Sequence, residues 1–394
     1  MLSVSALIRR QVTASDVLRY GRSSRAPATM LHFAADKKPV VVWNVTQRCN
    51  LHCIHCYAES RDREYPGELT TEEGFALLAD LAGFGVPVVL FSGGEPLMRP
   101  DLFRLMRRAR ELGMRAVLST NGTQIGRDEA RQLREIGVSY VGVSLDGLPR
   151  THDLVRGARG AFDEALAGIH ACQAEGIKVG LRVTAHGKNA HEVPDLMRLM
   201  TDERIDRMCI YHLAYAGRGA KISGFDLPAE QTRALMTDVF EWVARWPDGD
   251  TRELLTVDNH CDAPFLYLWL KERRAPHLDE VGQMLAWNGG NQSGIAIGCV
   301  DPQGNVHPDQ FSWKHTFGNV RERPFSEIWT DATHPLLAFY RDRRSRLSAR
   351  CQGCMFLDWC NGNLRIRAEH ATDDITGDDP SCYLSDDEIT RGPS

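Results

Sequence analysis

With 394 residues, the chain exceeds one typical domain of roughly 100–200 residues, so we expect one large catalytic domain with an appendage. A content of 43% hydrophobic and 25% charged residues excludes collagen, coiled coil and wholesale disorder. The 47 Lys and Arg residues against 52 Asp and Glu residues leave a net charge of −5, which lacks the basic excess of a general nucleic-acid binder.

The first 38 residues are rich in Arg and poor in acids. The apolar run 2–8 is too short for a secretory signal, and no stretch of the chain approaches the roughly 20 apolar residues that span a bilayer. We expect a solvated N-terminal arm over residues 1–38, with a transit peptide as the alternative. These features predict a cytoplasmic protein with neither a membrane nor a nucleic acid as partner.

Between about residues 39 and 213, short β-branched runs alternate with longer amphipathic segments. The predicted strands are 40–45, 88–91, 115–119, 140–144, 178–183 and 208–213. The predicted helices begin at Thr70-Thr71-Glu72-Glu73 and then cover 101–112, 128–136, 162–175 and 193–202. Six such units predict an α/β fold with a parallel sheet, either a partial barrel or an open doubly wound sheet. The functional residues should then follow the carboxyl ends of the strands.

The first predicted strand leads directly into three cysteines, Cys49, Cys53 and Cys56, spaced C-x3-C-x2-C. A structural zinc site takes four closed ligands, whereas a [4Fe–4S] cluster held by three cysteines keeps one iron open for another ligand. Zinc completed by His52 and His55 is one alternative, and a disulfide with a spare cysteine is another. Eleven cysteines, with seven in two tight groups, suit metal ligation in a reducing compartment better than disulfides.

This spacing, with His55 before the last cysteine and a βα barrel behind it, resembles the signature of the radical SAM superfamily. The resemblance implies a partial (βα)6 TIM-like barrel, in which Cys49, Cys53 and Cys56 hold the catalytic [4Fe–4S] cluster. It also implies that S-adenosylmethionine (SAM) binds the open iron and is cleaved to a 5′-deoxyadenosyl radical. Such a radical must form in a dry cavity beside its target C–H bond.

Polar motifs follow the next strands where that superfamily binds SAM. Ser92-Gly93-Gly94-Glu95-Pro96 follows the second strand, and its glycines let the backbone approach a ligand closely. The resemblance implies that this loop contacts the methionine amino group. The further cofactor-binding candidates are His55 and three polar side chains: Asn121 after the third strand, Ser144 at the end of the fourth and Arg182 on the fifth. Arg182 can pair with the SAM carboxylate through its planar fork. The alternative for each is local hydrogen bonding at a turn or strand end.

The remaining chain divides into two further segments. Residues 221–290 have helical patterns without a clear strand, and we interpret them as a linker and cap after a barrel domain over residues 39–220. Residues 291–394 start with a hairpin-like run, 296–307, and then have too few apolar residues for a core of their own.

Four cysteines in this last segment, Cys351, Cys354, Cys360 and Cys382, are spaced C-x2-C-x5-C-x21-C. On spacing alone, a zinc ribbon and a [4Fe–4S] cluster are both possible. The resemblance to the C-terminal extensions called SPASM or twitch favours a second [4Fe–4S] cluster, and ligation would explain how so core-poor a segment folds. Cys172 and Cys209 fit core positions, while Cys261 and Cys299 remain candidates for extra ligands.

Within the superfamily, the chain most resembles the NirJ-type enzymes of haem d1 biosynthesis. The resemblance rests on several runs: 43–44, 53–57, 66–69, 92–97, 215–219, 318–325 and 360–363. It implies an enzyme of the oxidoreductase or lyase type that removes two propionate side chains from 12,18-didecarboxysirohaem. It also implies an electron donor such as flavodoxin or ferredoxin. We hypothesise that the auxiliary cluster accepts an electron from the substrate radical.

A tetrapyrrole substrate requires an aromatic cleft with cations at its rim. The substrate-binding candidates are His212, Tyr215 and Arg218 after the sixth strand, and Trp313 and His315 in the tail that can cover the barrel mouth. Packing in the core or exposure at the surface is the alternative for each. Two other functions remain open: a SPASM-type peptide-maturation enzyme, and a non-catalytic iron–sulfur or zinc scaffold that does not cleave SAM.

Overall fold

The computed structural model describes residues 1–13, 16–21 and 38–391. Within these residues, eleven strands form one sheet in the order β1-β8-β7-β6-β5-β4-β3-β2-β9-β10-β11. The strands are β1 (Leu2–Ser3), β2 (Val40–Asn44), β3 (Val88–Ser92), β4 (Arg115–Thr120), β5 (Tyr140–Ser144), β6 (Val179–Ala185), β7 (Arg207–His212), β8 (Glu253–Val257), β9 (Ile297–Val300), β10 (Asn305–His307) and β11 (Gly318–Asn319).

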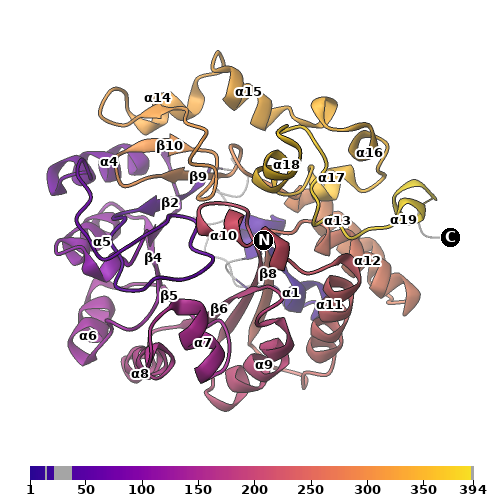
Figure 1. The fold of residues 1–394 in the computed structure, drawn as a ribbon, viewed down its shortest axis with the longest axis horizontal. Helices are drawn as coiled ribbons and strands as arrows, with labels where there is room; N and C mark the ends of the chain where they lie inside the picture. Colours follow the sequence, from indigo (N-terminus) through magenta and orange to yellow (C-terminus); the bar gives the residue numbers. More distant parts are fainter. Residues whose placement is uncertain (14–15, 22–37, 392–394) are drawn as a thin grey trace.

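Strands β2 to β8 are all parallel, and each pairs with the next one along the chain. An open doubly wound sheet reverses its strand order at a switch point, and this sequential order has no reversal. Helices α4 to α9 and α11 lie outside the curved sheet (Figure 1). The prediction of a partial parallel α/β barrel is therefore confirmed, and the six predicted strands match β2 to β7 with small shifts at their ends.

The helices between the barrel strands are the predicted ones, with α7 and the short α10 added. The helices are α1 (Val4–Arg9), α2 (Val17–Tyr20), α4 (Thr71–Phe84), α5 (Leu102–Glu111), α6 (Arg127–Ile136), α7 (Pro149–Arg156), α8 (Ala161–Ala174), α9 (Val193–Asp202), α10 (Arg218–Lys221), α11 (Ala229–Ala244), α12 (Asp262–Glu272), α13 (Leu278–Asn288), α14 (Phe325–Thr330), α15 (Pro335–Arg341), α16 (Ala349–Gln352), α17 (Leu357–Cys360), α18 (Arg365–Thr372) and α19 (Asp386–Arg391). Helix α4 begins with a capping box, in which the Thr70 hydroxyl accepts from the Glu73 N–H and the Glu73 carboxylate accepts from the Thr70 N–H. None of the helices that the model describes is long and apolar enough to cross a bilayer.

The N-terminal segment is not the solvated arm that we expected. Strand β1 pairs antiparallel with β8, and the side chains of Val4 and Leu7 on α1 are fully buried. The Tyr20 hydroxyl accepts a hydrogen bond from the Ser3 N–H at 2.8 Å. The apolar run 2–8 therefore covers the edge of the sheet. Residues 14–15 and 22–37 of the expected arm lie outside the described residues.

Residues 221–290 contain a strand that the sequence analysis missed. Strand β8 extends the parallel sheet beyond β7, and all five of its residues are buried. A short run such as Glu-Leu-Leu-Thr-Val cannot be distinguished from part of a helix by periodicity. Its carboxyl end adds a seventh position from which a side chain can reach the barrel mouth.

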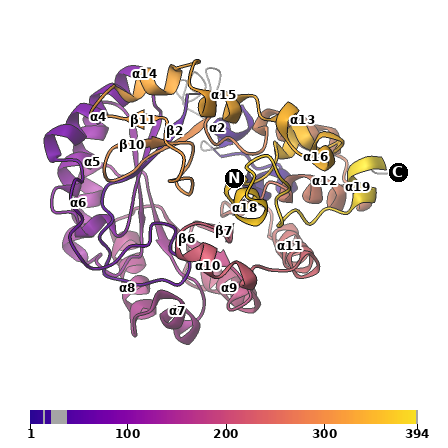
Figure 2. The same ribbon diagram turned by 45° about the horizontal axis from the view of Figure 1, so that its top comes forward.

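The tail joins the same sheet as the barrel. Strand β9 pairs in parallel with β2, and β10 returns antiparallel to β9, which agrees with the hairpin expected over 296–307. Helix α18 lies beside the N-terminus near the centre of both views (Figures 1 and 2). Arg367 on α18 donates to the carbonyl of Leu213 at 3.1 Å and to that of Asp258 at 2.6 Å. The tail is therefore attached at the barrel mouth.

Candidate active site

A cavity opens at the carboxyl ends of the parallel strands, as expected for this architecture. The residues that line it are Val42, Cys49, Leu51, Cys53, His55, Cys56, Tyr57, Leu90, Ser92, Gly93, Gly94, Ser119, Thr120, Asn121, Ser144, Arg156, Arg182, Thr184, Tyr211, His212, Leu213, Ala214, Arg218, Asp258, Gln310 and Phe311. The cavity therefore brings together the three N-terminal cysteines and most of the predicted cofactor-binding residues.

The loop after β2 presents Cys49, Cys53 and Cys56 to the cavity. The thiols of Cys49 and Cys53 accept hydrogen bonds from the Leu51 N–H at 3.4 Å and from Arg156 Nη1 at 3.5 Å. Burial raises the pKa of both thiols, although Arg156 opposes this effect at Cys53. These thiols need a cationic partner to ionise, and cluster iron provides one.

Three thiols from one loop at one cavity fit a [4Fe–4S] cluster that keeps one iron open. His52, which the zinc alternative required, is exposed and does not line the cavity. Among the residues that the structure describes, no three His, Cys, Asp or Glu side chains are grouped as they would be around a single metal ion.

The two glycines after β3 let the backbone pack closely, and their nearest neighbours are backbone atoms of the segment that leads into the cysteine loop. A Cβ atom on Gly93 would lie 2.3 Å from the Thr46 carbonyl oxygen, and one on Gly94 would lie 2.2 Å from that of Arg48. The Gly94 N–H donates to the Thr46 carbonyl at 2.7 Å. Both glycines also line the cavity. Any larger residue would therefore push the cysteine loop away from β3.

Glu95 does not line the cavity, unlike its glycine neighbours. Its buried carboxylate accepts hydrogen bonds from the N–H groups of Leu97 and Asn121 at 3.1 and 2.8 Å, and from the Thr120 hydroxyl at 2.8 Å. Burial raises the pKa of Glu95, while the two N–H groups oppose the rise. Glu95 thus joins the loop after β3 to the end of β4.

His55 lines the cavity and contacts the buried ion pair between Asp146 and Arg156. Asp146 Oδ2 lies 3.3 Å from His55 Nε2 and 2.6 Å from Arg156 Nη2, and Asp146 Oδ1 accepts from the Thr184 N–H at 2.8 Å. Burial alone would raise the pKa of Asp146, but Arg156 and His55 lower it to about 2. Burial lowers the pKa of His55 to about 4, so its ring is neutral at pH 7. The structure thus provides a fixed, uncharged imidazole beside the cysteines.

Two more predicted cofactor-binding residues are restrained by neighbours. Arg182 on β6 donates to the Ser119 hydroxyl and lies 5.9 Å from the centre of the Tyr140 ring. Asn121 donates to the Asn50 side-chain oxygen at 2.9 Å. Ser144 also lines the cavity, at the end of β5. These contacts bring the predicted set together, and SAM binding by its members remains a prediction.

The substrate candidates divide into two groups. His212 and Arg218 line the cavity, although each is also engaged elsewhere. His212 Nε2 lies 3.0 Å from Asp262 Oδ2, and Arg218 donates to the carbonyls of Cys53 at 2.7 Å and Ser60 at 3.0 Å. Arg218 therefore lines the cavity and also supports the cysteine loop.

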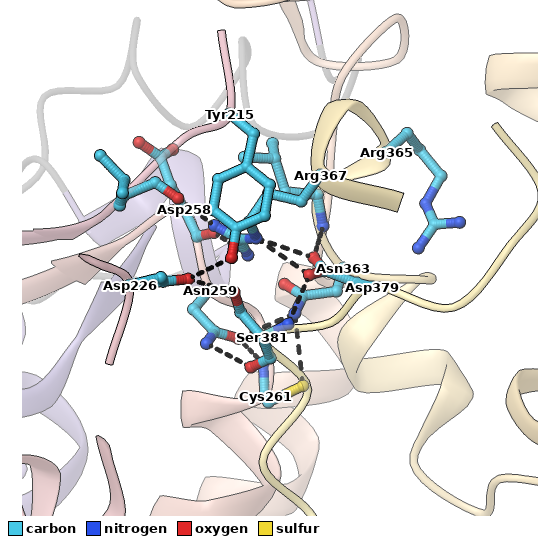
Figure 3. A network of polar contacts seen from close by, with 12 residues as sticks. Tyr215, Asp226, Asp258, Asn259, Cys261, Asn363, Arg365, Arg367, Asp379 and Ser381 are labelled. Carbon is cyan, nitrogen blue, oxygen red and sulfur yellow. Dashed lines mark hydrogen bonds and ion pairs between the residues drawn. The ribbon is translucent and has the colours of Figure 1, made fainter. Parts of the chain in front are cut away.

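Tyr215, Trp313 and His315 are not brought to the cavity. The Tyr215 hydroxyl donates to Asp226 at 2.8 Å (Figure 3). Trp313 stacks on His307 with the ring centres 6.2 Å apart, and His315 pairs with Glu369 at 2.8 Å. Because polar and aromatic contacts within the protein occupy these side chains, the expectation that they contact substrate is not supported.

Several cavity residues were not found from the sequence. They are Tyr57, Arg156, Tyr211, Asp258, Gln310 and Phe311. Arg156 ends α7 and has no motif of its own, while Asp258 follows the missed strand β8. The Tyr57 and Phe311 rings are 5.3 Å apart, so the tail supplies one wall of the cavity.

The second cysteine group gathers around Cys360. Cys351 and Cys354 interact electrostatically with Cys360, and Cys354 also interacts with Cys382. Cys261, which precedes α12, lies close enough to Cys360 and Cys382 for both thiols to raise its pKa. These thiols fit an iron–sulfur cluster, with Cys261 as a fifth thiol beside the four that were predicted.

Cys299 lies apart from both groups, on β9. Its thiol accepts a hydrogen bond from the Asn44 amide at 3.3 Å.

Comparisons with known proteins agree with this geometry. A family model described as the radical SAM superfamily matches residues 43–200, and a SPASM model described as an iron–sulfur cluster-binding domain matches residues 296–355. The Fe-coproporphyrin III synthase of Methanosarcina barkeri is 53% identical over 395 residues, which cover 99% of each chain. The pre-haem d1 synthase of Dinoroseobacter shibae is 43% identical over 354 residues, which cover 88% of this chain and 87% of that one.

A solved structure shares the fold. The crystal structure of Streptococcus suis SuiB bound to S-adenosylmethionine superposes with a TM-score of 0.69 at 18% identity, covering 90% of this chain and 80% of that one.

Proposed function

Because the chain belongs to the haem-biosynthesis family of radical SAM enzymes, we propose that it removes two carboxyalkyl side chains from an iron tetrapyrrole, 12,18-didecarboxysirohaem. The family membership rests on the 53% and 43% identical relatives and on the two matching family models. The chain is accordingly an enzyme with SAM and [4Fe–4S] clusters as cofactors. The scaffold alternative is set aside.

The two cysteine groups would each hold one of the clusters. Cys49, Cys53 and Cys56 would hold the first cluster, and the Cys351, Cys354, Cys360 and Cys382 thiols the second. When bound, the first cluster supplies the electron that cleaves SAM, and the radical released takes a hydrogen atom from the substrate. Arg156 provides positive charge beside Cys53, and its pairing with Asp146 fixes its position.

The cavity wall supports binding of a flat, acidic substrate. Tyr57, Tyr211 and Phe311 provide aromatic surface, while Arg182 and Arg218 provide cations for carboxylates. Enclosure by the tail limits access of water to the reacting atoms. We assign the tetrapyrrole to the side of the cavity bounded by Phe311 and Asp258.

We propose Fe-coproporphyrin III as the product. The observation that carries this choice is the 53% identity with a synthase of that compound over 99% of both chains, including the N-terminal residues that pack on β8. Fe-coproporphyrin III has four propionate and four methyl groups, so its formation from 12,18-didecarboxysirohaem requires the loss of two acetate groups and no propionate.

The second candidate is loss of two propionates toward haem d1, as the sequence analysis expected. The 43% identity with a pre-haem d1 synthase supports it, over 88% of this chain. Both reactions start from the same tetrapyrrole and differ in which side chain leaves.

One experiment distinguishes the two. The enzyme is reconstituted anaerobically with iron and sulfide, and given SAM, reductant and 12,18-didecarboxysirohaem. 5′-Deoxyadenosine and tetrapyrrole masses are then followed by LC–MS. We expect the mass loss of two acetate groups. Loss of two propionates would support the second candidate, while deoxyadenosine with an unchanged tetrapyrrole would overturn both and direct attention to a peptide substrate.

We further propose a flavodoxin or ferredoxin as the electron donor, and a cytoplasmic location. None of the eleven cysteines forms a disulfide, which suits a reducing compartment.

A further inference from the structure

Asp258 lines the cavity, and its carboxyl group has an unpaired oxygen. It follows β8 directly, and it is the one carboxylate among the described residues that line the cavity. Its Oδ2 atom is buried and has no hydrogen-bond partner in the described structure. A buried carboxyl oxygen left without a partner costs free energy, so a functional reason for it is expected.

The backbone around Asp258 holds this carboxyl in place. Its φ angle is +67°, in the left-handed region, and its carbonyl accepts from Arg367 Nη2 at 2.6 Å. The next residue, Asn259, donates to the Ser381 carbonyl at 2.9 Å and accepts from Asn363 at 2.8 Å (Figure 3). The loop is therefore clamped by the tail in a conformation that L-residues adopt at a cost, as is common at functional sites.

The surroundings favour the protonated form of this carboxyl. Burial, with a smaller contribution from Asp309, raises the pKa of Asp258 to about 7. The groups that oppose the rise are the amino group of Met1, Arg367 and His212, and none of them forms an ion pair with Asp258 in the described structure. A group with a pKa near the working pH both holds and releases a proton readily.

We propose that Asp258 is a catalytic acid, which protonates the side-chain fragment as it leaves the tetrapyrrole. This role rests on the function proposed above, and it assigns a residue that the family motifs do not include.

The chemical balance requires such a proton. After a hydrogen atom is taken from the ring carbon next to the one bearing the acetate, the bond between ring and acetate breaks homolytically. The ring gains a C=C bond, and the fragment leaves as a carboxymethyl radical. One electron, drawn from an iron–sulfur cluster, and one proton from Asp258 convert this fragment to acetate. Solvent then reprotonates Asp258.

The test compares the reconstituted wild-type enzyme with Asp258→Asn. Asn has the same shape and tolerates a positive φ, so the backbone is retained. We expect kcat for the tetrapyrrole product to fall about 100-fold or more. KM should stay within about twofold and deoxyadenosine should still form, so the ratio of deoxyadenosine to product rises. Circular dichroism and iron content check folding and cluster loading.

Asp226→Asn is the matched control, because Asp226 accepts from Tyr215 and Ser381 in the same network without lining the cavity. Its ratio of deoxyadenosine to product should equal that of the wild type. In addition, wild-type kcat should fall as the pH rises through about 7, since the acid loses its proton, and Asp258→Asn should lack this fall. In D2O the released acetate should carry one deuterium at its methyl carbon.

An unchanged ratio in Asp258→Asn, or a raised KM with an unchanged kcat, would overturn the role as an acid. So would a fragment released in an oxidised form. A wild-type enzyme that forms deoxyadenosine but leaves the tetrapyrrole intact would instead overturn the proposed function, and the role of Asp258 with it.

Discussion

The Asp146 carboxylate is fully buried and pairs with Arg156 while it contacts His55. The Arg156 guanidinium in turn lies against the Cys53 thiol. One carboxylate thus positions both the imidazole and the cation beside the first cysteine group. A buried ion pair of this kind matters for stability mainly because removing one partner leaves the other as an uncompensated buried charge.

Asp146→Asn should lower the free energy of unfolding at pH 7 by about 3–5 kcal/mol, because Arg156 keeps its charge without a partner. The folded pKa of about 2 lies below the unfolded value, so the contribution of Asp146 is complete above about pH 4 and is lost as the pH falls toward 2. Urea denaturation at pH 7 and acid titration of tryptophan fluorescence measure both effects. A variant as stable as the wild type would contradict the importance of this pair.

Gly94 tests the packing of the cysteine loop. Gly94→Ala places a Cβ atom 2.2 Å from the Arg48 carbonyl oxygen, so the loop must shift. We expect the iron of the first cluster and the formation of deoxyadenosine to fall at least tenfold, a loss of about 1.4 kcal/mol or more. Gly83→Ala on α4 is the control, since its Cβ meets nothing within 4 Å and the substitution favours the helix. Full iron loading of Gly94→Ala would show that the loop adapts.

Among the elements, β8 links three parts of the molecule. It continues the barrel sheet from β7, it pairs with β1 on its other edge, and its carboxyl end holds Asp258. Helix α1 packs against β8 and α11. Strand β1 and helix α1 therefore support the strand that leads to the cavity.

Leu7→Ala should lower the free energy of unfolding by about 2–5 kcal/mol, because its fully buried side chain leaves a cavity against the sheet edge. The partly buried neighbour Ile8 is the comparison, and Ile8→Ala should cost clearly less. Thermal and urea unfolding of the two variants measure the difference. If both substitutions lowered the free energy of unfolding by the same small amount, this segment would be a solvated arm after all.

At the scale of the whole molecule, the tail is bound to the barrel in three ways. Strand β9 pairs with β2, Arg367 donates to the ends of β7 and β8 while it pairs with the buried Asp379, and Cys261 meets the thiols of the tail. The second cysteine group therefore lies where the tail meets the start of α12.

Cys351→Ala should remove the second cluster and about half of the bound iron, while the first cluster still cleaves SAM. We expect deoxyadenosine with little or no tetrapyrrole product. Iron analysis, EPR of the reduced protein and LC–MS check these outcomes. Cys172→Ala is the control, because Cys172 is buried on α8, away from both cysteine groups, and should retain both clusters. Full turnover in a folded Cys351→Ala enzyme would refute a role for the second cluster.

The sequence alone determined six of the barrel strands, most of the helices between them and the two cysteine groups. These features are local: alternation along a strand, a capping box such as Thr70–Glu73, and cysteines a few residues apart are all visible in a short window. The glycines after β3 were identified for the same reason, although their main neighbour is the cysteine loop.

Only the tertiary structure decided which of the polar side chains face the cavity. From the sequence, Glu95 was a candidate for cofactor binding, and Tyr215 and His315 were candidates for substrate binding. In the structure, each of the three side chains is hydrogen-bonded to a side chain from another part of the chain. Asp258 looked ordinary, yet a clamped loop leaves its carboxyl unpaired. Whether a polar group is available depends on hydrogen-bond partners brought together by folding, and the spacing of residues along the chain does not contain that information.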